Sequence, residues 1–302
     1  MGRDLEVGRH LLHVEEFGRE GDPPVLYLHG GPGMGSCLFE AVQAERLGQR
    51  LRLITLDQRG VLRSSPLGVE EPLGVMDLVE DAEAVRTILG IPRWSLIGHS
   101  FGGYLAVLYA HAHPDAVDRL VLENPTLDIG SSARSLFAAA ALEYGALGDQ
   151  TAARTCLDLG LAHPATPARY LWLKLQGLLA GLGPARDNVY VHIADRHIVD
   201  RLIAGAPIPP ELWERGGRHA ARIVEEGRIF TPLLGLLPGI PQETLLIAGQ
   251  YDHVFAQDQL RAYLAAKPGS VLRIFPGSAH FPDLEEPERF AEEVCAFLVR
   301  RS

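Results

Sequence analysis

Short apolar runs rich in β-forming residues alternate with longer helical patterns from residue 24 to about 123, and this alternation limits most strongly how the chain can fold. Val25–Leu28 and Leu51–Leu56 are apolar almost throughout, which is typical of strands buried on both faces. Trp94–Ile97 and Leu120–Leu122 continue the series. Because strands separated by helices form parallel sheets with helices on both faces, the sequence predicts a large α/β domain.

Both ends of the chain fit the same sheet. Leu5–Val7 and Leu11–Glu16 are half-polar, as antiparallel edge strands would be. Thr244–Ala248 and Val271–Phe275 return to the pattern of buried strands. These runs together predict a mostly parallel, eight-stranded sheet. Helices are expected over Met76–Leu89, Leu105–Ala112, Gln257–Ala266 and Pro287–Arg300.

The alternation stops after Pro125 and resumes near residue 241. The segment between is rich in Ala, Leu and Gly, is interrupted by six prolines between Pro164 and Pro210, and contains no clear strand. We therefore expect one sheet domain, residues 1–125 and 241–302, with a helical cap, residues 126–240, inserted after the sixth strand.

Composition restricts the partners and the compartment. With 28 basic and 38 acidic residues the net charge is −10, so neither nucleic acid nor a membrane is an expected partner. The three cysteines are far apart and form no CxxC pair, which argues against a disulfide framework or a zinc site. Free thiols, the lack of a signal peptide and the lack of a spanning apolar run all favour a cytoplasmic location.

The run Gly98-His99-Ser100-Phe101-Gly102 follows an apolar strand, precedes a helix and fits the G-x-S-x-G pattern of a nucleophile elbow. In such a turn the serine hydroxyl stands above the sheet on a strained backbone, and side chains at the flanking glycines would clash. The sequence therefore predicts Ser100 as a nucleophile, with the N–H of Phe101 directed at the same space. A glycine-rich turn without chemistry is the alternative.

A nucleophilic serine of this kind needs an acid and a histidine further along the chain. Asp252 follows the strand that ends near Ala248, where it could orient a histidine, whereas its rival Asp258 falls inside the next helix. His280 follows the last strand and therefore lies at the same carboxyl edge of the sheet as Ser100. We predict a Ser100–Asp252–His280 triad. Of the neighbouring histidines, His99 is expected to face away from the hydroxyl and His253 to face outward.

A glycine-rich loop, His29-Gly30-Gly31-Pro32-Gly33, follows the first buried strand. Its glycines let a backbone N–H approach a reacting carbonyl, so we predict an oxyanion hole made by the N–H groups of Gly31 and Phe101. We expect His29 and Gly30 to support this loop.

The turn Asp57-Gln58-Arg59-Gly60 follows the next strand. Asp57 and Arg59 are expected to pin loops near the site rather than to act on substrate.

Taken together, the HGGPG loop, the DQRG turn, the GHSFGG elbow, Asp252 and His280 resemble the proline iminopeptidase family of α/β-hydrolases. The resemblance covers roughly residues 1–125 and 241–302. It implies the α/β-hydrolase fold, with a cap that carries glutamates for the free α-amino group of a peptide. It also implies that an N-terminal residue, often proline, is removed.

The chain departs from the family pattern in three places. The elbow has His99 and Phe101 where many members have Gly and Trp, and a glycine often replaces Leu62 or its neighbour. The third departure concerns the cap, where no segment matches the one that usually bears the glutamates. The available cap glutamates are Glu143, Glu211, Glu214, Glu225 and Glu226.

The predicted function is that of a serine hydrolase acting on a small-molecule or short-peptide substrate, without metal or organic cofactor. The first expectation is an aminopeptidase or amidase. An esterase or lactonase with the same triad, base chemistry by the His–Asp pair alone, and a non-catalytic binding module are the alternatives. Trp172 and Trp213 in the cap either line a pocket or pack helices. The sequence leaves the oligomeric state open.

Overall fold

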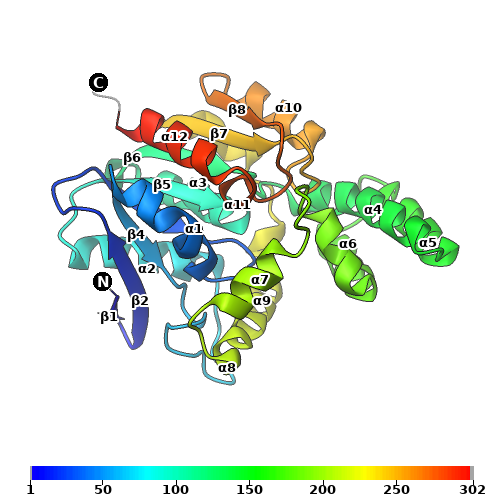
Figure 1. The fold of residues 1–302 in the computed structure, drawn as a ribbon, viewed down its shortest axis with the longest axis horizontal. Coiled ribbons are helices and arrows are strands. Elements are labelled where there is room, and N and C mark those ends of the chain that lie inside the picture. Colours follow the sequence, from blue (N-terminus) through cyan, green and yellow to red (C-terminus); the bar gives the residue numbers. More distant parts are fainter. Residues whose placement is uncertain (1, 300–302) are drawn as a thin grey trace.

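A computed structural model describes residues 2–299 and contains one sheet with helices on both faces (Figure 1). The strand order is β1-β2-β4-β3-β5-β6-β7-β8, with β1 and β2 antiparallel to their neighbours and the other strands parallel. The strands are β1 (Arg3–Val7), β2 (His10–Phe17), β3 (Pro24–Leu28), β4 (Arg52–Leu56), β5 (Trp94–His99), β6 (Val117–Glu123), β7 (Glu243–Gly249) and β8 (Val271–Phe275). The predicted eight-stranded fold class is confirmed.

Helices cover both faces of the sheet. The α-helices of the sheet domain are α1 (Cys37–Gly48), α2 (Val75–Ile88), α3 (Phe101–Ala112), α10 (Gln257–Ala266), α11 (Pro282–Glu285) and α12 (Pro287–Leu298). A short 3₁₀ helix, η1 (Pro114–Ala116), precedes β6.

Alternation along each strand divides the core into two parts. Val25 and Tyr27 of β3 pack with α1 and α12, and Tyr27 stacks on Phe39 with ring centroids 3.6 Å apart. Leu26 and Leu28 point to the other face and pack with α2, α3 and α10. Both faces of the parallel strands are therefore apolar, which is why these strands appear as continuous apolar runs in the sequence.

Most predicted elements are present, with two differences of substance. The helix predicted from Leu105 begins at Phe101, directly after the elbow. Helix α1 was not predicted from the sequence, and it supplies Phe39 and Leu47 to the core. The last helix ends at Leu298, and Arg300 lies outside the described residues.

Within residues 2–299, only helices and loops lie between β6 and β7. They are α4 (Ile129–Ala146), α5 (Gln150–Gly160), α6 (Ala168–Gly181), η2 (Gly183–Val189), α7 (Ile198–Gly205), α8 (Pro210–Trp213), α9 (Arg215–Glu226), η3 (Arg228–Phe230) and η4 (Leu234–Gly239). No helix of the described chain is both long and apolar enough to cross a bilayer.

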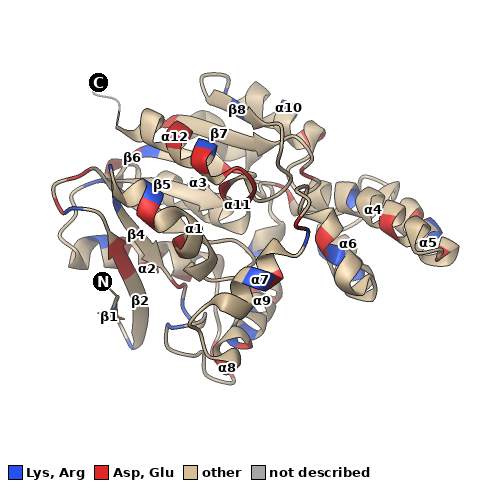
Figure 2. Cartoon of the chain, in the orientation of Figure 1, with Lys and Arg blue, Asp and Glu red and all other residues tan. Residues whose placement is uncertain are grey.

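This helical segment has two lobes. Helices α4, α5 and α6 share a core of their own and extend to one side of the sheet (Figure 1). Helices α7 and α8 instead pack against residues around β3 and β4, including Leu38, Val61 and Leu62. Trp172 and Trp213 are partly buried in this packing. Figure 2 shows acidic and basic residues interspersed over the sheet domain and both lobes, so the excess negative charge is spread out.

Candidate active site

Ser100 occupies a strained turn between β5 and α3. Its φ of +54° is a left-handed value that non-glycine residues rarely adopt, and it is the N-cap residue of α3. The carbonyl of Ser100 accepts bonds from the N–H of Gly103 and of Thr126, at 2.9 and 3.0 Å. Its own N–H donates to Glu123 O at 3.0 Å, so the turn is fixed to the end of β6.

The glycines around Ser100 are required by close contacts. A Cβ on Gly98 would lie 2.5 Å from Gly102 O, and one on Gly102 would lie 1.8 Å from Leu28 O. A Cβ on Gly103 would lie 2.6 Å from the Cβ of Pro125. No side chain fits at these distances, so the elbow places α3 directly against β3 and the loop after β6.

Asp252 and His280 form a buried hydrogen-bonded pair at the carboxyl edge of the sheet. His280 Nδ1 lies 3.1 Å from Asp252 Oδ1. Asp252 also accepts the N–H groups of Val254 at 2.8 Å and Phe255 at 2.9 Å. Burial alone would raise the pKa of Asp252, but the His280 ring and the two N–H groups outweigh it and lower that pKa. Asp252 is therefore an ionised acceptor that orients His280.

The hydroxyl of Ser100 bonds to a residue that was not predicted. Ser100 Oγ lies 3.2 Å from Thr126 Oγ1, and the described residues include no hydrogen bond between Ser100 and His280. Hydrogen bonds of catalytic groups are often long before substrate binds. Thr126 could have been found from the sequence, because it follows β6 at the same sheet edge as Asp252 and His280.

His99 lies beside His280 rather than beside the hydroxyl. Its Nε2 bonds to His280 O at 2.9 Å, and the two ring centroids are 4.8 Å apart. Burial, followed by the charge of His280, lowers the pKa of His99 to about 3, so the His99 ring is neutral. His99 Nε2 therefore donates to the His280 carbonyl and supports its loop. His253 is half-buried rather than turned fully outward.

The predicted oxyanion loop lies against the elbow. A Cβ on Gly30 would come within 3.0 Å of the Cβ of Ser100, and Gly31 has a φ of +116°. In the described chain neither the N–H of Gly31 nor that of Phe101 donates to another protein group. His29 supports the loop: its Nε2 lies 3.2 Å from the N of Gln58, and its Nδ1 lies 3.0 Å from Gly30 O.

Asp57 and Arg59 make the contacts of loop-pinning residues, but not with each other. Asp57 is fully buried and accepts bonds from Ser36 Oγ at 2.7 Å and Arg63 Nε at 2.7 Å. Arg59 forms an ion pair with the buried Asp81 at 2.5 Å. The partner Arg63 was not recognised from the sequence, although it stands in the same turn.

Asn124 joins two strand ends to the loop that carries His280. Its Nδ2 donates to Ala279 O at 2.8 Å, and its Oδ1 accepts the N–H of Gly249 at 3.0 Å. This side chain links the end of β6 to the end of β7 and to the loop that carries His280. Nothing in the sequence pattern marked Asn124, because its partners are distant along the chain.

Two buried carboxyl groups, those of Glu123 and Asp283, lie close to the loop that carries His280. Glu123 ends β6, and its Oε1 accepts the N–H of Asp283 of α11 at 2.8 Å. Burial, followed by the charge of Asp283, raises the pKa of Glu123 far above its usual range, and burial also raises the pKa of Asp283. The folded protein therefore retains protons on this pair that an unfolded chain loses above about pH 4.

We expect Asp283→Asn to stabilise the protein at pH 8 by about 1–3 kcal/mol and to have little effect at pH 4. Because the folded pKa is raised, the unfolded chain binds fewer protons in this range, and wild-type stability falls as pH rises. An asparagine side chain preserves the shape of the Asp283 carboxyl group but has no proton to lose. Urea unfolding at the two pH values measures the effect, and an equal loss of stability at both would contradict the explanation.

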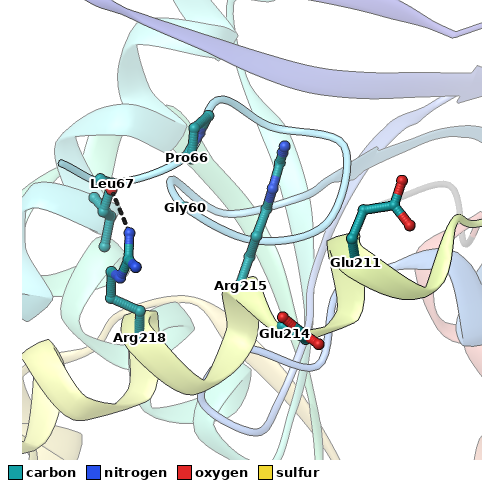
Figure 3. Close-up of a pocket in the computed structure, with 7 residues that line it drawn as sticks. All are labelled: Gly60, Pro66, Leu67, Glu211, Glu214, Arg215 and Arg218. Carbon is teal, nitrogen blue, oxygen red and sulfur yellow. Dashed lines mark hydrogen bonds between the residues drawn. The ribbon is translucent and has the colours of Figure 1, made fainter. Parts of the chain in front are cut away.

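The glutamates of the helical segment 126–240 lie mainly on the outside of the molecule. Glu143 is half-buried and accepts a bond from Asn188, whereas Glu211, Glu214, Glu225 and Glu226 are exposed. Glu211 and Glu214 line a pocket of about 340 Å³ together with Gly60, Pro66, Leu67, Arg215 and Arg218. Figure 3 shows Arg215 and Arg218 reaching from α9 toward the loop after β4, with Arg218 bonded to Leu67 O at 3.1 Å.

One group of side chains could hold a metal ion by distance alone. The ligand atoms of Asp187, His197 and Asp200, in the helical segment between β6 and β7, lie within 4.8 Å of one another. His197 and Asp200 are exposed, and His197 already bonds to Asp187 at 3.0 Å. These are the features of a surface ion pair, and none of the three residues belongs to the predicted triad.

Comparison with known proteins gives the same fold. Residues 23–287 match the model of the alpha/beta hydrolase fold family. A proline iminopeptidase of Neisseria gonorrhoeae is 40% identical over 113 residues, which are 37% of this chain and 36% of that protein. The match therefore spans about a third of the length of this relative.

Two solved structures are similar over almost the entire chain. A proline iminopeptidase-related protein from Thermus thermophilus is 24% identical with a TM-score of 0.78, and the match covers 99% of this chain and 97% of that one. An enol-lactonase from Burkholderia xenovorans LB400 is 20% identical with a TM-score of 0.67, over 99% and 100% of the two chains. At these identities the likeness concerns the fold.

Proposed function

The chain belongs to the alpha/beta hydrolase fold family, and on that premise we propose that it is a serine hydrolase with Ser100 as nucleophile, His280 as base and Asp252 as orienting acid. The observation that carries the proposal is the buried pair of His280 Nδ1 and Asp252 Oδ1, 3.1 Å apart, at the sheet edge where the strained Ser100 turn stands. An ionised Asp252 holds the proton on Nδ1, which leaves the lone pair of Nε2 free to act as a base.

In this proposal His280 takes the Ser100 proton while Ser100 Oγ attacks a carbonyl carbon. The N–H groups of Gly31 and Phe101 then donate to the oxyanion, since neither has another acceptor within the described residues. His280 returns the proton to the leaving amine or alcohol, and an acyl group remains on Ser100. Water, deprotonated by His280, releases the acyl group. None of these steps requires a metal or organic cofactor.

For the substrate we propose an amide at the N-terminus of a peptide, cleaved as a proline iminopeptidase cleaves it, with residues 126–240 as a cap over the site. The 40% identity to the Neisseria proline iminopeptidase over 113 residues supports this substrate class, as does the HGGPG loop. The three buried free cysteines support a cytoplasmic location.

The position of the cap glutamates favours a second candidate, an esterase or lactonase. A free α-amino group needs a carboxylate partner, and four of the five cap glutamates are exposed while Glu143 is bonded to Asn188. An ester or lactone has no amino group and makes no such demand. The two candidates share every catalytic residue and differ only in what surrounds the acyl group.

A panel of three substrates separates the candidates. We expect prolyl-naphthylamide to be cleaved at least about tenfold faster than its N-acylated form, because losing a charge-assisted contact to the amino group costs about 1.5–3 kcal/mol. A p-nitrophenyl ester is the third member, and the Ser100→Ala variant gives the background rate. Faster cleavage of the blocked amide than of the free one would contradict the aminopeptidase, and turnover of the ester without measurable cleavage of either amide would favour the second candidate.

A further inference from the structure

A short loop joins the two cap lobes and lies on the loop that carries His280. We call residues 190–193, which follow η2 and precede α7, the bridging segment. The backbone N–H of His280 donates to Tyr190 O at 2.9 Å, and the two rings are 5.9 Å apart. The proposed catalytic base is therefore bonded directly to the cap.

Glu285, the last residue of α11, joins these two loops through a single carboxylate. Its Oε1 accepts the N–H groups of Ala279 and Phe281, at 2.8 and 3.2 Å. Its Oε2 accepts the N–H groups of His192 and Ile193, at 2.6 and 3.2 Å. Two of the four donors are the immediate neighbours of His280, and the other two belong to the bridging segment.

Two further contacts reinforce this junction. Val191 packs with Phe281 and Leu284 in a small buried apolar cluster. The ring of His192 stacks on Tyr251, the residue before Asp252, with centroids 3.5 Å apart and ring planes 12° from parallel. The bridging segment therefore contacts the loop of the base and the loop of the acid.

We propose that Glu285 is a positioning residue that couples the placement of the bridging segment to that of His280. The inference rests on the proposed function of His280 as the base. A carboxylate suits this role because its two oxygens together accept four hydrogen bonds and donate none. Since Ala279 and Phe281 flank His280, a shift of the carboxylate shifts the backbone of His280, and displacements of about 1 Å can cost about 10² in rate.

The test uses Glu285→Gln, with Glu286→Gln as the matched control. The glutamine in the first variant keeps the shape of the side chain but offers one acceptor and one donor, so two of the four N–H groups face an NH₂ group. Glu286 is the next residue along the chain. It accepts hydrogen bonds from Gly277 N at 2.9 Å and from Ser278 Oγ at 2.7 Å, and among the described residues it makes no hydrogen bond to the bridging segment.

Two measurements are made on the full chain. The first is the rate at which a fluorophosphonate probe phosphonylates the serine oxygen with release of fluoride, which requires the base but little of the substrate pocket. We expect Glu285→Gln to slow this rate about tenfold or more and Glu286→Gln to change it less than about threefold. The second is backbone hydrogen exchange, which we expect to rise at both 190–193 and 279–281 in Glu285→Gln only.

A Glu285→Gln rate within about twofold of wild type would overturn the proposal, as would increased exchange in only one of the two loops. If this variant does not fold, hydrogen exchange in the wild-type chain provides the test. We expect the backbone N–H groups of 190–193 and of 279–281 to be protected to a similar degree, because the two loops should open together. Protection factors that differ between the two loops by more than about tenfold would contradict the coupling. A wild-type chain that does not react with the probe at Ser100 would instead contradict the proposed function itself.

Discussion

Ser100→Ala is expected to lower kcat for acyl transfer by about 10⁵–10⁶ while the protein stays folded. The loss is large because the substitution removes the attacking oxygen itself. The fold should persist because Ser100 Oγ has one hydrogen-bonding partner among the described residues, Thr126 Oγ1 at 3.2 Å. Alanine retains the Cβ that the turn already accommodates at a φ of +54°.

Turnover of the best substrate in the panel measures this effect, and circular dichroism checks the fold. Thr126→Val is the matched control, because it removes the only described partner of the Ser100 hydroxyl while preserving shape. We expect this control to cost less than about tenfold, the value of one uncharged hydrogen bond. Near-normal turnover by Ser100→Ala would exclude Ser100 as the nucleophile.

Asp252→Asn is expected to lower kcat by about 10⁴ with little change in KM. Asp252 accepts bonds from Val254, Phe255 and His280, and both of its oxygens are used. An asparagine can keep only one oxygen, and its NH₂ group must face a ring nitrogen or a backbone N–H. When it faces the ring, the proton of His280 moves to Nε2, which can no longer act as a base.

Asp258→Asn is the control for this variant. Asp258 is the rival acid, but it is exposed and pairs with Arg261 within α10. We expect activity within about twofold of wild type, since exposed ion pairs contribute about 0–1 kcal/mol. A severe loss in Asp258→Asn together with normal turnover in Asp252→Asn would reverse the assignment of the acid.

The strands could be predicted because both faces of the sheet are buried, so β3 and β4 appear in the sequence as almost continuous apolar runs. Helix α3 was predicted to start too late, because its first turn is the glycine-rich end of the elbow, where helical propensity is low. Helix α1 was missed because its buried side includes polar Gln43 as well as Phe39 and Leu47, so its apolar stripe is broken.

The pairing of Asp252 with His280 could be predicted, because the sequence shows that each residue follows the end of a strand. Thr126, Asn124 and Glu285 were not predicted, although they contact Ser100 or the loop that carries His280. Their roles depend on which loops meet in space, and Glu285 makes its bonds to His192 and Ile193, more than ninety residues away. The position of Thr126 directly after β6 was a usable signal, whereas spacing along the chain does not show which distant loops Asn124 and Glu285 contact.

The glycine contact between the oxyanion loop and α9 bears on how substrate reaches Ser100. A Cβ on Gly33 would lie 2.4 Å from Gly216 O, and one on Gly216 would lie 2.2 Å from Gly33 O, so the two backbones touch. Arg215 and His219 of the same helix bond to carbonyls of the loop after β4. These contacts hold α9 against the loops that follow β3 and β4, and we therefore do not expect substrate to enter between α9 and the oxyanion loop.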